Sequence, residues 1–302
     1  MTEPELLSAV ICTRNRPDLI AAAVGSVLAN DDPNFELIVI DQSTDDSTRL
    51  AIGKHLADPR LRYIHTTRAG LSAAYNRAIA EARGNILAFT DDDCVAPRCW
   101  LSSVRAEFER FPGVDLIYGE VRVPPDAAQG VHIPGLRFAC RERLSARDGF
   151  RILGMGANFA VRRRSIEACG GFDEALGGGG PLRSSQDFDL QYRYFRGGLV
   201  SLVTPAFAVD HYGARTPGQW AATLYAYGFG DGAFYMKHIR CFDVLALWLY
   251  SKSVGREIAR VVVKRGILRR PHPSEYLKGL IRGALESFRF PIDRRQRMYV
   301  LR

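Results

Sequence analysis

Residues 85–93 read Asn-Ile-Leu-Ala-Phe-Thr-Asp-Asp-Asp, an apolar run that ends in three consecutive carboxylates. The apolar part has the length and composition of a buried strand. In an extended segment alternate side chains share a face, so Asp91 and Asp93 are expected to point together while Asp92 points away. Two carboxylates side by side favour a divalent cation, Mg²⁺ or Mn²⁺, that bridges a diphosphate. The alternative is a solvated acidic turn that caps a helix near Pro97.

The sequence before this run alternates between strand and helix patterns. The strands are predicted at residues 6–12, 35–41 and 60–65, and the helices at residues 17–30, 43–55 and 70–83. Such alternation predicts an α/β fold, with a mostly parallel sheet covered by helices on both faces. Ligands of such sheets bind beyond the carboxyl ends of the strands, where the three aspartates lie.

Composition and charge narrow the class of protein. The chain has 302 residues, of which 47% are hydrophobic and 25% charged, as in a folded globular protein of one or two domains. The net charge is +8 and is uneven: residues 231–302 hold 16 Lys and Arg against 6 Asp and Glu, a balance of +10, and residues 1–230 carry −2. Because no recognition motif accompanies this charge, no binding to nucleic acid is expected. The region is predicted either to lie on an anionic membrane surface or to pack as a helical extension with a solvated basic face.

The sequence also indicates a cellular location. The six cysteines show no Cys-x-x-Cys pair and no zinc-ligand spacing, so a disulfide scaffold or zinc finger is not expected. The acidic start, Met-Thr-Glu-Pro-Glu, predicts no signal peptide. The most apolar later stretch, residues 244–250, is too short for a membrane span. A cytoplasmic protein is expected, with peripheral contact at the inner face of the membrane as the open alternative.

A second pair of carboxylates, Asp187 and Asp189, begins a predicted helix after the four glycines of residues 177–180. Consecutive glycines favour a mobile loop. Helical residues two apart lie about 200° apart around the axis, so the two carboxylates cannot face one cleft. Asp189 stands four residues before Arg193, the spacing of a structural ion pair. Asp187 is therefore the predicted general base, because the helix N-terminus favours its ionised form; the alternative is a simple helix cap.

Several motifs occur in a fixed order along the first two thirds of the chain. They are Val10-Ile-Cys-Thr-Arg-Asn-Arg16, Ile38-Val-Ile-Asp41-Gln-Ser-Thr-Asp-Asp, Gly70-Leu-Ser-Ala-Ala-Tyr-Asn76-Arg-Ala and the triplet at residues 91–93. From about residue 6 to 212 the chain resembles the family 2 glycosyltransferases, enzymes of the GT-A fold. The resemblance implies a donor of the UDP, GDP or dTDP sugar type, Mn²⁺ or Mg²⁺ on its diphosphate, and a glycan or lipid-linked acceptor. It also implies transfer with inversion, in the synthesis of a polysaccharide, a glycolipid or a cell-surface glycan.

The resemblance further implies which residues form the site. Donor contacts are expected from Thr13, Arg14, Asn15, Arg16, Asp41, Arg68, Asn76, Asp91 and Asp92. The metal ligands are expected to be Asp91, Asp93 and His211, and an imidazole beside carboxylates suits Mn²⁺. The resemblance also points to Asp187 as the base, although Gln186 replaces the Glu usual before it. The acceptor side is expected at Gly156, Ala157, Asn158 and Gln186.

The predicted organisation is a GT-A catalytic domain in residues 1–230 and a basic helical extension in residues 231–302. Within the catalytic domain, residues 1–120 would bind the nucleotide sugar and residues 121–230 would form the acceptor side. Two other functions stay open. A sugar nucleotidyltransferase would consume a nucleoside triphosphate and release pyrophosphate, whereas a non-catalytic sugar-nucleotide-binding protein would not need Asp187.

Overall fold

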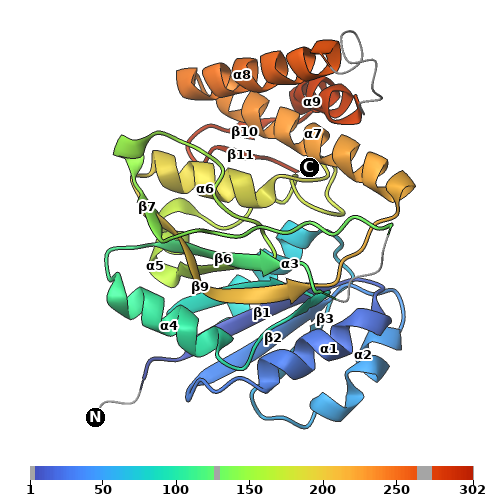
Figure 1. Cartoon of the computed structure of the whole chain (residues 1–302), viewed down its shortest axis with the longest axis vertical. Coiled ribbons are helices and arrows are strands. Elements are labelled where there is room, and N and C mark those ends of the chain that lie inside the picture. Colours follow the sequence, from blue (N-terminus) through green and yellow to red (C-terminus); the bar gives the residue numbers. More distant parts are fainter. Residues whose placement is uncertain (1–3, 126–129, 264–273, 302) are drawn as a thin grey trace. The chain divides into compact units, whose positions relative to one another are not determined.

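The computed structural model describes residues 4–125, 130–263 and 274–301, which form two compact units (Figure 1). The first unit comprises Met1–Ala69, Ala73–Gly171 and Gln191–Ala214. The second comprises Gly70–Ser72, Phe172–Leu190 and Arg215–Arg302. Besides the region expected as a helical extension, residues 231–302, the second unit thus takes in Gly70–Ser72, Phe172–Leu190 and residues 215–230.

A nine-stranded sheet forms the centre of the first unit (Figure 1). Its strands are β1 (Leu7–Thr13), β2 (Phe35–Asp41), β3 (Leu61–His65), β4 (Ile86–Asp91), β5 (Cys94–Val95), β6 (Leu116–Arg122), β7 (Glu142–Leu144), β8 (Asn158–Arg162) and β9 (Ser201–His211). They lie in the order β3-β2-β1-β4-β8-β6-β9-β5, with β7 paired to β9. Strands β5, β7 and β8 run against the direction of the other six. The predicted α/β fold with a mostly parallel sheet is confirmed.

Helices cover both faces of this sheet. They are α1 (Pro17–Leu28), α2 (Ser47–Ala51), η1 (Gly53–His55), α3 (Leu71–Glu81), α4 (Trp100–Arg110), η2 (Ala146–Asp148), α5 (Arg163–Cys169) and the later part of α6 (Gln186–Arg196). Buried side chains of α1 and α4 share a core with Leu7, Ala9 and Ile11 of β1. On the opposite face, Tyr75 of α3 meets Phe89 of β4 edge to face, with ring centroids 5.2 Å apart. Because successive side chains of a buried strand point to opposite faces of the sheet, each strand contributes to an apolar layer on both faces.

The register of the parallel strands brings their carboxyl ends to one edge. Thr13 at the end of β1 pairs with Asp41 at the end of β2, and Cys12 pairs with Asp91 at the end of β4. The polar residues that follow these strands in the sequence are therefore neighbours in space, as expected for a ligand site in an open α/β sheet.

One predicted helix start is wrong. The helix expected at residue 43 begins at Ser47, whose backbone N–H donates to Asp45 Oδ1 at 2.9 Å. Ser43 does not cap it, because its hydroxyl accepts the backbone N–H of Asn15 at 2.8 Å and bonds the Thr48 hydroxyl. Ser43 therefore links the loops after β1 and β2, close to the carboxyl edge of the sheet.

The second unit is mainly helical, as the predicted helical extension of residues 231–302 leads us to expect. Its elements are the first turn of α6, α7 (Pro217–Arg240), α8 (Val244–Val261), α9 (Glu275–Glu286), η4 (Ser287–Arg289) and a hairpin of β10 (Ile292–Asp293) and β11 (Met298–Tyr299). Helices α7 and α9 meet backbone to backbone at glycines: a Cβ on Gly232 would lie 2.0 Å from the Leu280 carbonyl oxygen. Among the described residues, no helix combines the length and apolar character needed to cross a bilayer.

A buried ionic cluster anchors the start of α6 within the second unit. Lys237 Nζ on α7 lies 2.6 Å from both Asp173 Oδ2 and Asp189 Oδ1, and all three side chains are fully buried. His238 Nε2 is 2.9 Å from the same Asp189 oxygen, and burial lowers the pKa of His238 to about 4. Asp189 thus forms buried ion pairs with Lys237 and His238 of α7, and its predicted ion pair with Arg193 stays a prediction. The cluster holds the first turn of α6, which also carries Asp187.

The glycine loop at residues 177–180 has a defined conformation. Gly177 and Gly179 have φ angles of +96° and +77°, a region that favours glycine. The Gly177 N–H donates to the Ser184 carbonyl at 3.2 Å, and the Leu71 N–H donates to the Gly178 carbonyl at 2.8 Å. The glycines that suggested a mobile loop are needed here for the shape of a hydrogen-bonded turn.

Candidate functional site

An arginine fork links two of the three aspartates that follow β4. The chain turns at Asp92 and Asp93 before β5 begins, so it is not extended there. Arg16 Nη1 lies 2.5 Å from Asp92 Oδ1, and Arg16 Nη2 lies 2.6 Å from Asp93 Oδ2. The Thr13 hydroxyl also donates to Asp92 Oδ2 at 2.7 Å. The expectation that Asp92 points away from Asp93 is wrong, because the turn brings both carboxylates to one guanidinium.

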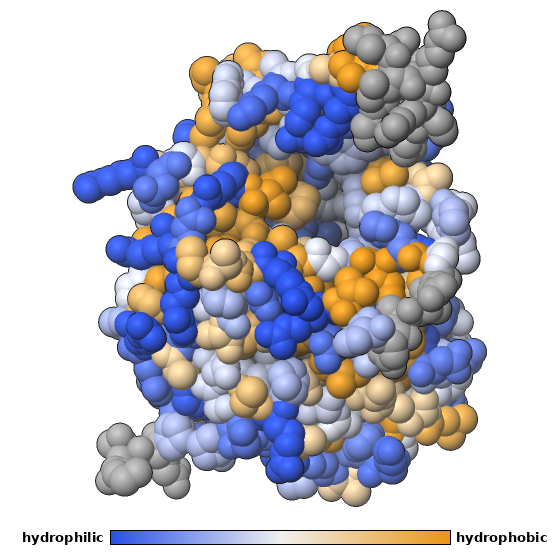
Figure 2. Space-filling view, viewed as in Figure 1, coloured by the Kyte–Doolittle hydropathy of each residue, from blue (hydrophilic) through white to orange (hydrophobic). Residues whose placement is uncertain are grey.

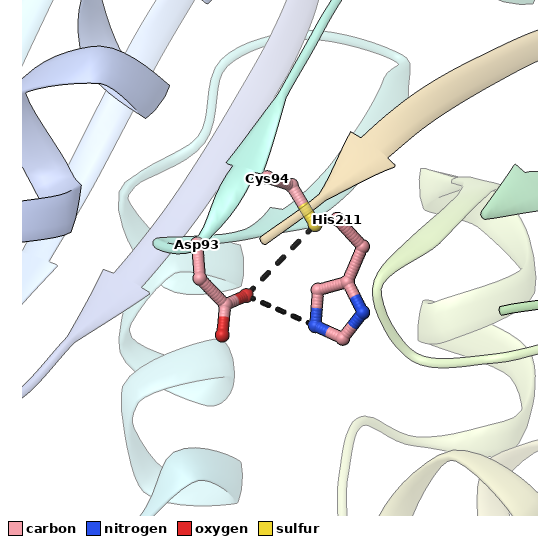
Figure 3. A group of neighbouring side chains, drawn as sticks. All are labelled: Asp93, Cys94 and His211. Atoms are coloured by element: carbon pink, nitrogen blue, oxygen red, sulfur yellow. Dashed lines mark hydrogen bonds and ion pairs between the residues drawn. The ribbon is translucent and has the colours of Figure 1, made fainter. Parts of the chain in front are cut away.

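Three side chains beside this fork form a group that can hold a metal ion (Figure 3). They are Asp93, Cys94 and His211, all buried, and one ligand atom from each lies within 4.8 Å of the others. Asp93 Oδ1 is 3.3 Å from His211 Nε2 and 4.0 Å from Cys94 Sγ. In Figure 3 the second oxygen of Asp93 points away from both partners; that oxygen is the one bound to Arg16.

The orientation of His211 suits a ligand role. Its Nδ1 lies 2.9 Å from the Pro134 carbonyl oxygen, which can only accept a hydrogen bond. The Nδ1 atom therefore carries a proton, and Nε2 is directed at Asp93. A ring nitrogen fixed by a backbone carbonyl is the usual arrangement of a metal-binding histidine.

The third aspartate, Asp91, has another environment. Its Oδ1 accepts a hydrogen bond from the Tyr75 hydroxyl of α3 at 3.3 Å. The sequence predicted Asp91 and Asp93 as a pair of ligands, but the metal-capable group among the described residues consists of Asp93, Cys94 and His211. The strand ends at Asp91 and the chain turns at Asp92 and Asp93, so the two carboxylates do not share one face of an extended strand.

The electrostatics of this edge favour a bound cation. Burial, and then the charges of Asp93 and Asp92, raise the pKa of Asp91 to about 7. Burial also raises the pKa of Asp92 to about 6, against the opposing effect of Arg16. Burial opposes the ionisation of Asp93, but the His211 hydrogen bond and charge, together with Arg16, hold the pKa of this carboxyl well below its usual range. Three carboxylates thus lie near only two groups that can be positively charged, Arg16 and His211. An additional positive charge would stabilise the ionised forms of these carboxylates.

The loops after β1 and β2 are joined around Asp41. Asp41 is fully buried, and its Oδ1 accepts the Ser43 N–H at 2.8 Å while its Oδ2 accepts the Tyr63 hydroxyl at 2.6 Å. Asn15 has a positive φ of +54°, and its Oδ1 accepts the Thr44 N–H at 2.9 Å. These hydrogen bonds hold the two loops in shape without any ligand. An aspartate at the end of a strand often has only this structural role.

The remaining expected donor residues lie around this edge or beside α3. Arg14 is exposed in the turn between β1 and α1. Arg68 is also exposed, and its carbonyl accepts Gln42 Nε2 at 2.5 Å, so it belongs with the loop after β2. Asn76 lies on α3, and its Oδ1 is close to the backbone of Gly171. A Cβ atom added to Gly171 would lie only 2.5 Å from this oxygen. The structure therefore associates Arg68 with the β2 loop and Asn76 with the Gly171 backbone.

One residue expected on the acceptor side serves the interior instead. The Asn158 side chain is fully buried, its Oδ1 accepts Trp100 Nε1 at 3.0 Å and its Nδ2 donates to the Glu120 carbonyl at 2.8 Å. The expected contact of this side chain with an acceptor is wrong, because both of its polar ends are used inside the unit. Ala157 is buried next to it, and Gly156 lies in the preceding turn.

Asp187 and Gln186 begin α6 in the second unit. Asp187 is half-buried, and its Oδ1 accepts the Phe188 N–H at 3.0 Å, whereas Gln186 is buried. The preceding Ser185 has a φ of +69°, and its hydroxyl donates to Asp231 Oδ1 at 2.6 Å. Ser185 thus uses its hydroxyl to anchor the backbone to α7. The start of α6 is therefore bound to α7 at two points, Asp231 and Lys237.

The sequence did not single out Cys94 or Tyr75. Cys94 directly follows the aspartate triplet, but cysteine in a buried strand usually serves packing. Its place in the site depends on the antiparallel pairing of β5 with β9, which sets Cys94 opposite His211. A tyrosine among apolar positions of a helix likewise gives no sign that its hydroxyl reaches Asp91.

The chain is similar to known proteins in both sequence and structure. Residues 8–170 match the family described as Glycosyl transferase family 2. A segment of 235 residues is 28% identical to the uncharacterized protein y4gI of Sinorhizobium fredii and covers 71% of this chain. A segment of 95 residues, 31% of this chain, is 36% identical to the putative colanic acid biosynthesis glycosyl transferase WcaA of Escherichia coli. The matches span only a quarter of the first relative and 34% of the second.

Two solved structures share the fold. The mannosyltransferase PcManGT from Pyrobaculum calidifontis, solved in complex with GDP-Man and Mn²⁺, superposes with a TM-score of 0.64 at 18% identity and covers 93% of this chain and 86% of its own. S. aureus TarS 1–349 in complex with UDP-GlcNAc superposes with a TM-score of 0.57 at 16% identity over 76% of this chain and 65% of its own. These likenesses confirm the predicted GT-A fold.

Proposed function

Because the chain belongs to glycosyl transferase family 2, we propose that it moves a sugar from a nucleoside-diphosphate sugar to an acceptor hydroxyl, with a divalent metal and with inversion at the anomeric carbon. The observation that carries the proposal is the buried group of Asp93, Cys94 and His211 beside the Arg16 fork. The group lies where the sheet strands β4 and β9 end, the usual ligand site of such a sheet.

The donor is proposed to bind along the edge that runs from β2 to β4. The tip of β1 and Asp41 would hold the base and ribose, and Arg16 and Arg68 would lie near the diphosphate. Arg16 is suited to this role because its guanidinium is held by Asp92 and Asp93 and is still one third exposed. The full donor set remains the one predicted from the sequence: Thr13, Arg14, Asn15, Arg16, Asp41, Arg68, Asn76, Asp91 and Asp92.

The metal is proposed to bind Asp93 and His211, with Asp91 close by. The residues fit a divalent ion, because a carboxylate oxygen and an imidazole nitrogen 3.3 Å apart converge in a buried site of excess negative charge. When bound, Mn²⁺ or Mg²⁺ would neutralise the diphosphate and stabilise it as a leaving group. Arg16 would add a second positive charge on the same side.

Asp187 is proposed to deprotonate the acceptor hydroxyl. Two observations support it over Asp189: Asp187 is half-buried and open to solvent, whereas Asp189 is fully buried against Lys237 and His238. A base at the N-terminus of a helix stays ionised, as a proton acceptor must. The activated oxygen would attack the anomeric carbon opposite the departing diphosphate, so the configuration inverts. Gly156, Ala157 and Gln186 remain the proposed acceptor side.

The donor and the acceptor are proposed as chemical classes, a type of nucleotide sugar and a type of glycan acceptor. The solved neighbours bind GDP-Man or UDP-GlcNAc, so donors of the GDP and UDP type come first and dTDP sugars next. Escherichia coli WfgD, 33% identical over 29% of this chain, is described as a glucosyltransferase that acts on a diphosphoundecaprenol-linked sugar. A polysaccharide, glycolipid or cell-surface glycan is therefore the proposed product, made from a glycan or lipid-linked acceptor.

Nucleotide products separate this proposal from its rivals. The protein is incubated with Mn²⁺ and a panel of UDP, GDP and dTDP sugars, with water as a slow acceptor, and the nucleotides are separated by anion exchange. We expect one donor to yield its nucleoside diphosphate. In a parallel incubation with a nucleoside triphosphate and a sugar phosphate, release of pyrophosphate would instead show a nucleotidyltransferase. Donor binding without any product would favour a non-catalytic protein.

We also propose that α8 contacts an anionic membrane surface. Its outer face carries apolar side chains with basic ones between them, and Figure 2 shows hydrophobic and hydrophilic residues side by side over this helix. Val244 is 77% exposed and Trp248 55% exposed, with Lys252 Nζ 4.8 Å from the centre of the Trp248 ring. Such a surface suits anionic headgroups. Four basic residues of the same region, Lys264, Arg265, Arg269 and Arg270, lie outside the described part of the chain.

Vesicle flotation tests this contact with a matched pair of variants. The wild type is expected to float with vesicles that contain phosphatidylserine and not with neutral ones. Val244→Asp should abolish flotation, whereas Leu50→Asp should not, although Leu50 is equally exposed at 78% in the first unit. The contact would be ruled out if the wild type did not float with vesicles that contain phosphatidylserine, or if both variants lost flotation equally.

A further inference from the structure

Cys94 belongs to the hydrophobic core of the first unit and also lies beside two polar side chains that can bind a metal. It stands opposite His211 in the antiparallel pairing of β5 with β9, so both side chains leave the same face of the sheet. Its sulfur lies 4.0 Å from Asp93 Oδ1, the oxygen that also faces His211 Nε2 (Figure 3). Asp93 therefore presents one oxygen to Arg16 and the other to a sulfur and a nitrogen.

We infer that Cys94 is a protein ligand of the metal, which makes the centre a carboxylate, thiolate and imidazole set rather than an all-oxygen and imidazole set. The inference deepens the proposed function, because it uses the same site and adds a residue and a metal preference to it. A thiolate favours softer and borderline ions such as Co²⁺, Zn²⁺ and Cd²⁺ over Mg²⁺. The centre is accordingly expected to prefer Mn²⁺ to Mg²⁺ and to be blocked by Zn²⁺ or Cd²⁺.

The distances suit one ion. Metal bonds of about 2.0–2.3 Å to oxygen, nitrogen and sulfur place neighbouring ligand atoms roughly 3.3–4 Å apart. Asp93 Oδ1 is 3.3 Å from His211 Nε2 and 4.0 Å from Cys94 Sγ, so a small inward movement of the side chains completes the set. Binding would release the thiol proton to solvent, and the metal charge would compensate the thiolate.

A second buried cysteine gives a comparison. Cys12 lies on β1 opposite Asp91, is buried like Cys94 and experiences the charges of Asp91 and Asp92. Among the described residues, however, Cys12 does not join the group whose ligand atoms converge. Both cysteines are thus buried near carboxylates. Of the two, Cys94 is the one whose sulfur lies in a group with the His211 imidazole. Cys12→Ser is therefore a matched control for Cys94→Ser.

Cobalt spectroscopy tests the inference without any substrate. Purified protein is titrated with Co²⁺, and the near-ultraviolet sulfur-to-cobalt charge-transfer absorption is recorded with the visible ligand-field bands. We expect the charge-transfer absorption in the wild type and in Cys12→Ser. In Cys94→Ser it should disappear while the ligand-field bands persist, because Asp93 and His211 still bind. Cys94→Ala serves as a second variant, and circular dichroism checks that each variant is folded.

The outcomes separate this inference from the proposed function. Ligand-field bands without charge-transfer absorption in the wild type would overturn the cysteine ligand and leave a metal centre of Asp93 and His211. Absorption that survives Cys94→Ser would assign the thiolate to another cysteine and also overturn it. No spectral change at any Co²⁺ concentration would contradict both the thiolate and the metal centre. Turnover without metal would count against the proposed function alone.

Discussion

Asp187→Asn is expected to lower kcat by about 10²–10⁴-fold, the usual contribution of a general base. Asparagine keeps the size of the side chain and can still accept the Phe188 N–H, but it cannot take a proton from the acceptor hydroxyl. Donor affinity should be nearly unchanged, because the proposed donor residues lie on other elements. The measurement is kcat with the cognate donor and acceptor, beside donor binding followed by calorimetry.

Asp189→Asn provides the contrast from the same turn of α6. Asp189 is buried against Lys237 and His238, and removal of one partner from a buried ion pair costs about 3–5 kcal/mol. This variant is expected to have a clearly lower Tm, whereas Asp187→Asn should melt like the wild type. Full activity in Asp187→Asn would remove Asp187 from the base role, and lost donor binding would move it to the donor site.

Asp93→Asn is expected to lower kcat/KM by about 10²–10³-fold or more, since a catalytic metal contributes several kcal/mol and 1.36 kcal/mol is a factor of ten. The amide is neutral, so Asp93 Oδ1 no longer offers a charge to the metal and Oδ2 no longer balances Arg16. Nucleotide binding should lose its dependence on Mn²⁺. The readouts are kcat/KM against Mn²⁺ concentration and nucleotide affinity with and without the metal.

A carboxylate at the opposite end of the sheet controls for general charge effects. Asp58 pairs with Arg60 at 2.7 Å just before β3 begins, away from the carboxyl ends of the strands. Asp58→Asn should keep the Mn²⁺ dependence of the wild type. If Asp93→Asn retained that dependence as well, the metal would have to bind elsewhere.

The sequence predicts the sheet well because its central strands are buried on both faces. Residues 37–40 form an uninterrupted apolar run, Leu-Ile-Val-Ile, and the strand occupies the predicted Phe35–Asp41. The helix at residues 17–30 begins with Pro17, whose fixed φ suits a first helical position, and it is observed as Pro17–Leu28. Local patterns suffice for such elements, and the order of strands and helices then limits the topology.

The site is less predictable because it depends on turns and long-range pairing. The bend after Asp91 turns Asp92 towards Arg16, and no residue pattern distinguishes that bend from two more residues of strand. The β5–β9 pairing brings Cys94 to His211 from a distant part of the chain. The resemblance implies an acceptor contact for Asn158, but hydrogen bonds with Trp100 and the Glu120 carbonyl hold this side chain in the interior.

Nucleotide binding with and without metal tests the central claim most directly. UDP, GDP and dTDP are each added to the full chain, with or without Mn²⁺, and the Tm is followed. A ligand at about 100 times its Kd adds about 2.7 kcal/mol to the free energy of unfolding. We predict a clear rise in Tm with one nucleoside diphosphate, in the presence of Mn²⁺ and lost in Asp93→Asn. A metal-dependent nucleotide-sugar site would be contradicted if no nucleotide raised the Tm. It would also be contradicted if the Tm rose equally without Mn²⁺ and in Asp93→Asn.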